Sequence, residues 1–161
     1  MTRGQIDTNL LQITQASDGI LLLTLNDPDR SNVLSEGMLT ELNHAFFWAA
    51  NSMDVRVIIL SSVGPIFCAG HDLKEMSAAR QSNDKGRAYF TKILDQCSSI
   101  MQKIVACPKP VIAEIGGVAT AAGCQLVASC DLAVASENAK FCTPGVHIGL
   151  FCSTPMVALS R

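Results

Sequence analysis

Short apolar runs alternate along this chain with longer segments whose apolar residues recur at helical spacing. The runs are Leu10–Ile13, Ile20–Leu25, Val55–Leu60, Val111–Ile115 and Leu132–Ala135, with a possible short run at Lys140–Cys142. The first two runs are separated by Ser17-Asp18-Gly19 and are typical of a β-hairpin, whereas the next two each follow a long helical segment. This order predicts an α/β fold with crossover connections between the strands.

The helical segments have clear boundaries. Ser35 is suited to cap the first helix, and Glu36 favours its first turn. The apolar residues of that helix are Met38, Leu42, Ala45, Phe46 and Ala49. A second, longer helix is expected to end before Pro108 and Pro110. Its predicted buried stripe consists of Phe90, Ile93, Leu94, Cys97, Ile100, Met101 and Ile104. A further helix begins within Thr154–Leu159.

The composition favours one globular domain and excludes several partners. The 161 residues are 48% hydrophobic and 16% charged, so the chain can bury a core and is too apolar to be disordered. A formal net charge of −2 supplies no basic surface for nucleic acid and no polybasic membrane anchor. No apolar run reaches the length of a membrane span. We therefore expect residues 1–161 to form a single domain that binds neither nucleic acid nor a membrane.

The seven cysteines are odd in number and scattered, which is not the pattern of a disulfide framework. No pair has the C-x-x-C spacing of a zinc or thioredoxin-type site, and we expect no metal. Most lie in apolar stretches, which indicates structural thiols in a reducing compartment. Residues Met1 to Leu10 contain no apolar signal core, so the chain is expected in the cytoplasm. A mitochondrial matrix protein without its transit peptide would look the same.

Two junctions between a strand and a helix carry the strongest indication of chemistry. They are Phe67–Lys74 and Gly116–Gln125, and the second is expected to open a helix at Ala119–Gly123 that runs to about Ser129. Small residues let a ligand approach the backbone, and amides at a helix start lack partners. Two such junctions side by side would direct two amides at one point, as in an oxyanion hole. The alternative is that both are close-packed turns.

Three stretches make the chain resemble a known family. They are Leu23–Leu34, Val57–Lys74 and Lys109–Gly149, and they cover most of the chain. In this order they resemble the crotonase superfamily, the enoyl-CoA hydratase/isomerase family, whose members bind acyl-CoA thioesters. The resemblance implies an α/β fold with a crotonase-like β/α spiral core of repeated ββα units. Because family members continue with further helices, it also implies that the C-terminal helical part is absent and that residues 1–161 are a truncated acyl-CoA-binding core.

The resemblance assigns a role to each junction. The backbone amides of His71 and Ala122 match the oxyanion donors, which polarise the thioester carbonyl as an enolate forms. No cofactor is implied, because CoA is part of the substrate. The positions that match the substrate-contacting segments are Arg30, Ser31, Val33, Ala69, Gly70, His71, Asp72, Leu73, Lys74 and Gly123. Arg30 and Lys74 are candidates to pair with CoA phosphates, the alternative being a solvated surface charge.

Both acid/base positions of the family's hydratases differ in this chain. Where those enzymes have two glutamates, this sequence has Gln125 and Gly145. Neither residue exchanges a proton near neutral pH, so ordinary hydration is expected to be nearly abolished. The imidazoles of His71 and His147 are alternative proton carriers, and for His71 a capping or solvent contact is the competing interpretation.

Four other polar residues are expected to be structural. Asp72 should cap the helix that follows it, and Asp131 should accept a hydrogen bond. Glu114 should face outward by strand alternation, and His44 should lie on the surface.

Three functions remain open on these grounds. In the first, the chain is an acyl-CoA enzyme of the hydratase/isomerase type, that is, a lyase or isomerase of fatty-acid metabolism. Alternatively, it is a non-catalytic acyl-CoA-binding or regulatory protein, or an incomplete chain that acts through association with other subunits. By family analogy, a completed fold would form a homo-oligomer, either a trimer or a hexamer.

Overall fold

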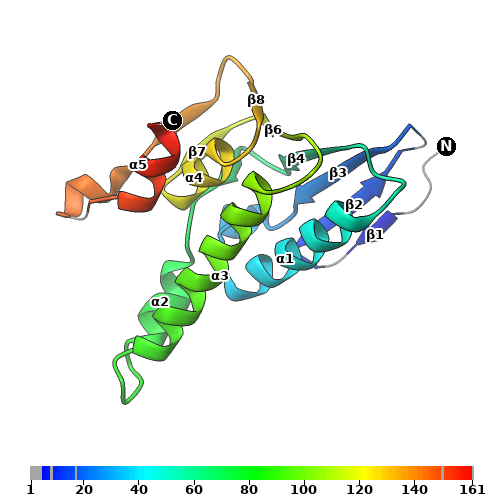
Figure 1. Cartoon of the computed structure of the whole chain (residues 1–161). Helices are drawn as coiled ribbons and strands as arrows, with labels where there is room; N and C mark the ends of the chain where they lie inside the picture. The colour runs from blue at the N-terminus through cyan, green and yellow to red at the C-terminus, as the bar shows by residue number, and fades with distance from the viewer. Residues whose placement is uncertain (1–4, 8, 17, 150, 161) are drawn as a thin grey trace.

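The computed structural model describes residues 5–7, 9–16, 18–149 and 151–160 (Figure 1). Its strands are β1 (Gln5–Asp7), β2 (Leu11–Gln15), β3 (Ile20–Leu25), β4 (Val57–Ser62), β5 (Ile66–Cys68), β6 (Val111–Ile115), β7 (Val118–Thr120), β8 (Leu132–Ala135) and β9 (Lys140–Cys142). Its α-helices are α1 (Glu36–Asn51), α2 (Leu73–Ala79), α3 (Arg87–Val105), α4 (Ala122–Ala128) and α5 (Ser153–Leu159). Two 3-10 helices are η1 (Pro28–Arg30) and η2 (Pro144–Ile148). Ser17, part of the predicted hairpin turn, lies outside the described residues.

The strands form two sheets. The larger has the order β1-β2-β3-β4-β6-β8, in which the first three strands are antiparallel and the later ones pair in parallel. The smaller sheet, β5-β7-β9, is parallel throughout. The chain repeatedly passes through one strand of the larger sheet, then one of the smaller, then a helix, as in β4-β5-α2 and β6-β7-α4. The predicted α/β class and its repeated strand-strand-helix units are therefore confirmed, and so is the hairpin of β2 and β3.

The first helix packs as its sequence predicts. The hydroxyl of Ser35 accepts a hydrogen bond from the amide of Met38 at 3.2 Å, which caps α1. All five apolar residues predicted for its inner face are buried. Helix α3 lies beside α1, in front of the larger sheet (Figure 1). From the sheet, Leu21, Leu23 and Leu25 of β3 are fully buried in the same core.

The predicted stripe of α3 is too wide. The side chain of Leu94 is 53% exposed, although its neighbour Ile93 is buried. Successive residues point about 100° apart around a helix, and a helix with one side on the core buries only a narrow stripe. Ile93, Cys97, Ile100, Met101 and Ile104 form the buried stripe, whereas Phe90 is half-buried, so the prediction for Leu94 was wrong.

Strands β5 and β7 also correct the sequence prediction, which ran the chain from β4 and β6 through turns and loops into the helices. Each has only three residues, too few to show an alternating pattern. Their pairing with each other, and not any local propensity, makes them strands. This small sheet fixes the geometry of the two predicted junctions.

The four structural assignments are confirmed. Glu114 and His44 are exposed. The carboxylate of Asp131 accepts the amide of Val111 at 2.7 Å, and Asp72 caps α2. None of the helices in the described ranges is long and apolar enough to span a membrane.

The C-terminal elements are exposed more than the rest. Every residue of β8 and β9 is solvent-exposed, including Leu132, Val134 and Phe141.

All seven cysteines are free thiols. Cys68, Cys97 and Cys124 are buried, whereas Cys142 is exposed.

Candidate functional site

The two predicted junctions lie next to each other. Strands β5 and β7 pair in parallel, with Ile66 opposite Val118 and Cys68 opposite Ala119. Parallel strands end at the same edge of a sheet, so the turns that follow them emerge side by side. The first turn leads into α2 through His71, and the second into α4 through Ala122.

Glycines allow the turns to interlock. A Cβ atom on Gly123 would lie 2.1 Å from the carbonyl oxygen of Cys68, which is inside van der Waals contact. A Cβ atom on Gly70 would lie 3.1 Å from the amide nitrogen of Ala122. Gly70 also has a φ of +84°, a left-handed conformation that favours glycine. The contacts at Gly70 and Gly123 therefore both pack the two turns tightly and keep them next to each other.

The two amides assigned as oxyanion donors are available. Ala122 is the first residue of α4, where an amide has no intrahelical acceptor. The amides of Cys124 and Gln125, which follow it, both donate to the carbonyl of Ala121. Within the described part of the chain, neither the His71 amide nor the Ala122 amide has a hydrogen-bond acceptor. The arrangement therefore presents two N–H donors from neighbouring turns.

A third segment, residues 27–34, is bonded to the first turn. The amide of Ala69 donates to the carbonyl of Ser31 at 3.1 Å, and the amide of Leu34 donates to the carbonyl of Gly70 at 2.8 Å. The side chain of Asn32 is buried and donates to the carbonyl of Ile66 at 2.7 Å. These bonds bring together residues 30–33 and residues 69–74, which contain all the predicted substrate-contacting positions except Gly123.

The charged residues of these segments differ in their surroundings. The guanidinium of Arg30 forms an ion pair with the buried carboxylate of Asp72. Lys74 is exposed and pairs with no carboxylate of the described residues. Leu73 is 73% exposed, which leaves an apolar side chain in solvent at the start of α2. Ser31 and Val33 are half-buried beside them.

The side chain of His71 lies in an unusual setting. Its Nε2 atom is buried and has no hydrogen-bond partner among the described residues. Burial lowers the pKa of His71 below its ordinary value of 6.5, so the imidazole is neutral at pH 7. Burial also raises the pKa of Cys68 to about 12, which makes that thiol unreactive. A neutral imidazole is able to accept or donate one hydrogen bond at the site.

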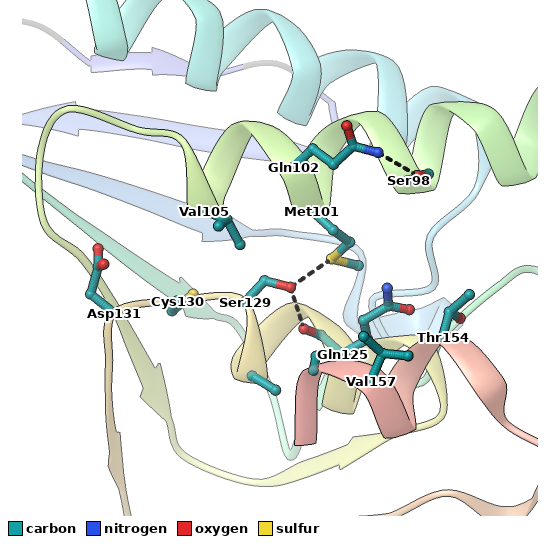
Figure 2. A pocket seen from close by; sticks show the side chains of 12 residues that line it. Ser98, Met101, Gln102, Val105, Gln125, Ser129, Cys130, Asp131, Thr154 and Val157 are labelled. Carbon is teal, nitrogen blue, oxygen red and sulfur yellow. Dashed lines mark hydrogen bonds between the residues drawn. The ribbon is translucent and has the colours of Figure 1, made fainter. Parts of the chain in front are cut away.

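A cavity of about 460 Å³ lies between α3, α4 and α5. Figure 2 shows the carboxamide of Gln125 entering this space from α4, with Thr154 and Val157 of α5 facing it. Residues lining the cavity are Ser98, Met101, Gln102, Val105, Gln125, Ala128, Ser129, Cys130, Asp131, Thr154, Val157 and Ala158. Gln125 follows Ala122 by one helical turn, so the cavity adjoins the second junction.

The two positions that replace the family glutamates are not equivalent. Gln125 lines the cavity, whereas Gly145 and His147 lie in η2, outside the described residues that line it. His147 is exposed. Sequence reasoning did not find the residues contributed by α3 and α5, because nothing in their spacing distinguishes a cavity wall from a core stripe. It also did not find the ion pair between Arg30 and Asp72, which are 42 residues apart.

No cluster of metal-ligating side chains supports a metal site here. Among the described residues, no group of three or more histidine, cysteine, aspartate or glutamate side chains is placed to hold an ion. The chemistry that this arrangement offers comes from backbone amides, a neutral imidazole and a carboxamide.

The chain is similar to proteins of one known family. The sequence model of a family described as enoyl-CoA hydratase/isomerase matches residues 15–159. The chain is 50% identical over 151 residues to the rat protein named enoyl-CoA hydratase domain-containing protein 3, mitochondrial, covering 94% of this chain and 49% of that protein. The chain thus spans about half the length of the curated relatives it matches.

Solved structures show the same fold. The crystal structure of human enoyl-CoA hydratase domain-containing protein 3 matches with a TM-score of 0.85 at 48% identity, covering 94% of this chain and 58% of that one. An enoyl-CoA hydratase from Mycobacterium smegmatis matches with a TM-score of 0.87 at 50% identity, covering 94% of this chain and 57% of that one.

Proposed function

The chain belongs to the enoyl-CoA hydratase/isomerase family, as its motifs predicted, and from this premise we propose that it binds acyl-CoA thioesters and polarises their carbonyl group. The donors are the backbone amides of His71 and Ala122. The observation that carries this proposal is that the two turns interlock through Gly70 and Gly123, and that neither amide has an acceptor in the described structure. These are donors fixed before a ligand arrives, and such donors need no reorganisation during a reaction.

The chemistry follows from where charge develops. Removing a proton from the carbon next to a thioester carbonyl places negative charge on the carbonyl oxygen. Two N–H groups directed at that oxygen stabilise the enolate more than the ground state, and losing one such donor typically costs about 2.7–4 kcal/mol in the barrier. The proposed substrate class is therefore an acyl-CoA whose reaction passes through an enolate.

The proposed CoA contacts lie on the two segments that are bonded to each other. Ser31 and Val33 belong to one, and Ala69, Leu73 and Lys74 belong to the other, with Gly123 beside them on the second turn. The free ammonium of Lys74 is the candidate for a CoA phosphate. The exposed side chain of Leu73 offers an apolar surface to the pantetheine arm.

Ordinary hydration is not the proposed reaction. A hydratase needs a general acid and a general base around a water molecule, each worth about 10²–10⁴-fold in rate. Gln125 lines the cavity with a carboxamide that cannot exchange protons, and Gly145 has no side chain. We propose slow turnover or none for hydration, with the neutral imidazole of His71 as the candidate to carry a proton.

A second candidate function is acyl-CoA binding without chemistry. It is favoured by the same Gln125, because a carboxamide can hold a polar group of the ligand without reacting. Association with other subunits is the third candidate, and the exposed apolar side chains of β8 and β9 favour it. A homo-oligomer and a location in the mitochondrial matrix belong to this proposal; the name of the rat relative says that that protein is mitochondrial.

Thermal unfolding with and without butyryl-CoA tests the proposal. At about 100 times its dissociation constant, a ligand adds about 2.7 kcal/mol to the free energy of unfolding. We expect a cooperative transition that moves upward with butyryl-CoA and by less with CoA alone. A transition that ignores both ligands would reject acyl-CoA binding.

Two further assays separate the enzyme from the binding protein. Exchange of the protons next to the carbonyl of butyryl-CoA, measured by NMR in D₂O, is expected for an enzyme and absent for a binder. The double variant Gln125→Glu with Gly145→Glu is expected to raise crotonyl-CoA hydration. Binding without exchange would favour the non-catalytic function.

A further inference from the structure

We propose that Arg30 is a positioning residue that orients the first oxyanion turn by holding the carboxylate of Asp72, and that it does not bind a CoA phosphate. This inference rests on the proposed function, because it assigns the orientation of the His71 amide. It starts from the burial of Asp72, which is only 4% exposed. A buried carboxylate is costly unless it is paired and hydrogen-bonded.

Both oxygens of the Asp72 carboxylate are in use. Its Oδ1 accepts the amides of Lys74 at 2.8 Å and Glu75 at 3.2 Å, which caps α2. Its Oδ2 pairs with the guanidinium of Arg30. The His71 N–H belongs to the peptide between Gly70 and His71, whose carbonyl accepts from the amide of Leu34. The Asp72 carboxylate fixes the residue that follows His71, and so limits how the donor peptide can rotate. The Arg30 side chain therefore holds the end of the turn at Asp72 from outside the turn.

The other end of the turn is tied to the same segment by backbone bonds. Ala69 donates to Ser31, and Leu34 donates to Gly70. Gly70, a glycine with a positive φ, lies between Ala69 and Asp72, and its backbone is held by these bonds on one side and by the ion pair of Asp72 on the other. Segment 28–34 therefore holds the turn at both ends, by main-chain bonds at Ala69 and Gly70 and by one side-chain ion pair at Asp72.

The charges around Arg30 argue against a phosphate ligand. Its guanidinium lies 3.8 Å from a carboxylate oxygen of Glu75 and 3.8 Å from one of Asp27, in addition to Asp72. Three carboxylates surround one cation, so the local field repels a further anion. Glu75 is itself fixed, because it accepts the phenol of Tyr89 at 2.9 Å and the amide of Glu36 at 3.0 Å. The network belongs to the support of α2.

The experiment compares two affinities in each variant, one for CoA and one for butyryl-CoA. CoA has the phosphates without the butyryl thioester, so the ratio of the two affinities reports on the contacts of the thioester group and not on those of the phosphates. We expect Arg30→Met to lower this ratio by about three- to tenfold, the equivalent of one weakened hydrogen bond, with CoA affinity unchanged. Lys74→Met is the matched control, since losing a phosphate contact should weaken both ligands equally and leave the ratio unchanged.

Two further variants test the pathway through Asp72. Asp72→Ser keeps an oxygen that can cap α2 but removes the charge that holds Arg30. It should lower the ratio as Arg30→Met does, and the double variant should be no worse than either single one. The infrared carbonyl stretch of bound, ¹³C-labelled butyryl-CoA should move less from its value in water in both variants. An equal loss of CoA and butyryl-CoA affinity in Arg30→Met, or no loss at all, would overturn the inference.

A readout without ligand separates this inference from the proposed function. In the ligand-free protein, amide hydrogen exchange over residues 69–75 should accelerate in Arg30→Met and stay unchanged in Lys74→Met. If the unaltered chain binds no CoA compound but exchange accelerates, the proposed function fails and the positioning role holds. If exchange is unaltered, the positioning role fails whatever binds. Should Arg30→Met not fold, Arg30→Lys decides the same question, with a smaller acceleration expected because its flexible ammonium holds Asp72 less tightly.

Discussion

The two turns of the candidate site are held in place by different means. The first, residues 69–72, depends in part on side chains, because Arg30 and Asp72 fix one of its ends, while main-chain bonds hold Ala69 and Gly70. The second, residues 117–123, depends on the absence of side chains, because the backbone of residues 65–68 occupies the space where Cβ atoms of Gly117 and Gly123 would lie. A turn held by side chains can be weakened in steps. A turn held by backbone contact is either intact or disrupted.

The largest effect is expected from adding one carbon to the second turn. In Gly123→Ala the new Cβ would lie 2.1 Å from the carbonyl oxygen of Cys68, and neither backbone can move without separating β5 from β7. We expect a loss of about 3 kcal/mol or more in the free energy of unfolding, measured by urea denaturation. Gly116→Ala is the control, since a Cβ there meets no atom within 4 Å. Equal stabilities of the two variants would contradict the interlocked arrangement.

A smaller loss is expected at Gly70. Its φ of +84° makes any Cβ unfavourable, and the added carbon would also lie 3.1 Å from the amide nitrogen of Ala122. Gly149→Ala measures the cost of the positive φ alone, because Gly149 has a φ of +75° with open space around it. Each should lose about 1–2 kcal/mol from backbone strain. Only Gly70→Ala should also lose affinity for butyryl-CoA; a loss in both would mean that the effect is not local to the donor.

The cap of α2 should be worth more than an ordinary cap. Ser35→Ala removes the cap of α1 and is expected to cost about 1 kcal/mol in the free energy of unfolding. Asp72→Ala removes a cap and also leaves Arg30 without its buried partner, so we expect about 2 kcal/mol. Chemical denaturation at pH 7 measures both. The comparison fails if Asp72→Ala proves no worse than Ser35→Ala.

The smallest expected effect is a pH dependence from His71. Because burial lowers its pKa in the folded chain, the unfolded chain binds the proton more tightly. Stability from this residue is therefore complete above the ordinary value of 6.5 and falls as the pH drops below it. We expect urea midpoints measured between pH 7.5 and 5 to fall less steeply in His71→Asn. Parallel pH profiles would show that the imidazole does not titrate in a buried setting.

The parts of the fold that the sequence predicts are those encoded locally. The Ser35 cap, the inner face of α1 and the hairpin of β2 and β3 follow from residues close to one another in sequence. Strands β5 and β7 do not, because three residues carry no period and only their mutual pairing defines them. The exposed side chain of Leu94 shows a further limit of sequence patterns, since helical spacing gives the direction of a buried stripe but not its width.

In the candidate site, too, local features could be predicted from the sequence and contacts between distant residues could not. The two glycine-containing junctions are visible in the sequence, because each is a run of neighbouring small residues between a strand and a helix. The pairing of Arg30 with Asp72 spans 42 residues and joins two segments whose contact only the folded chain reveals. The wall that α5 gives to the cavity beside Gln125 is equally non-local.

The burial of Cys68 gives the chain a reporter of its own. Its thiol sits in strand β5, within the residue whose carbonyl Gly123 approaches, and its pKa of about 12 leaves almost no thiolate at pH 8. An alkylating reagent will modify exposed Cys142 at once and Cys68 only when β5 and β7 part. The delay between the two modifications, followed by mass spectrometry, therefore measures how often the site opens, without an introduced label.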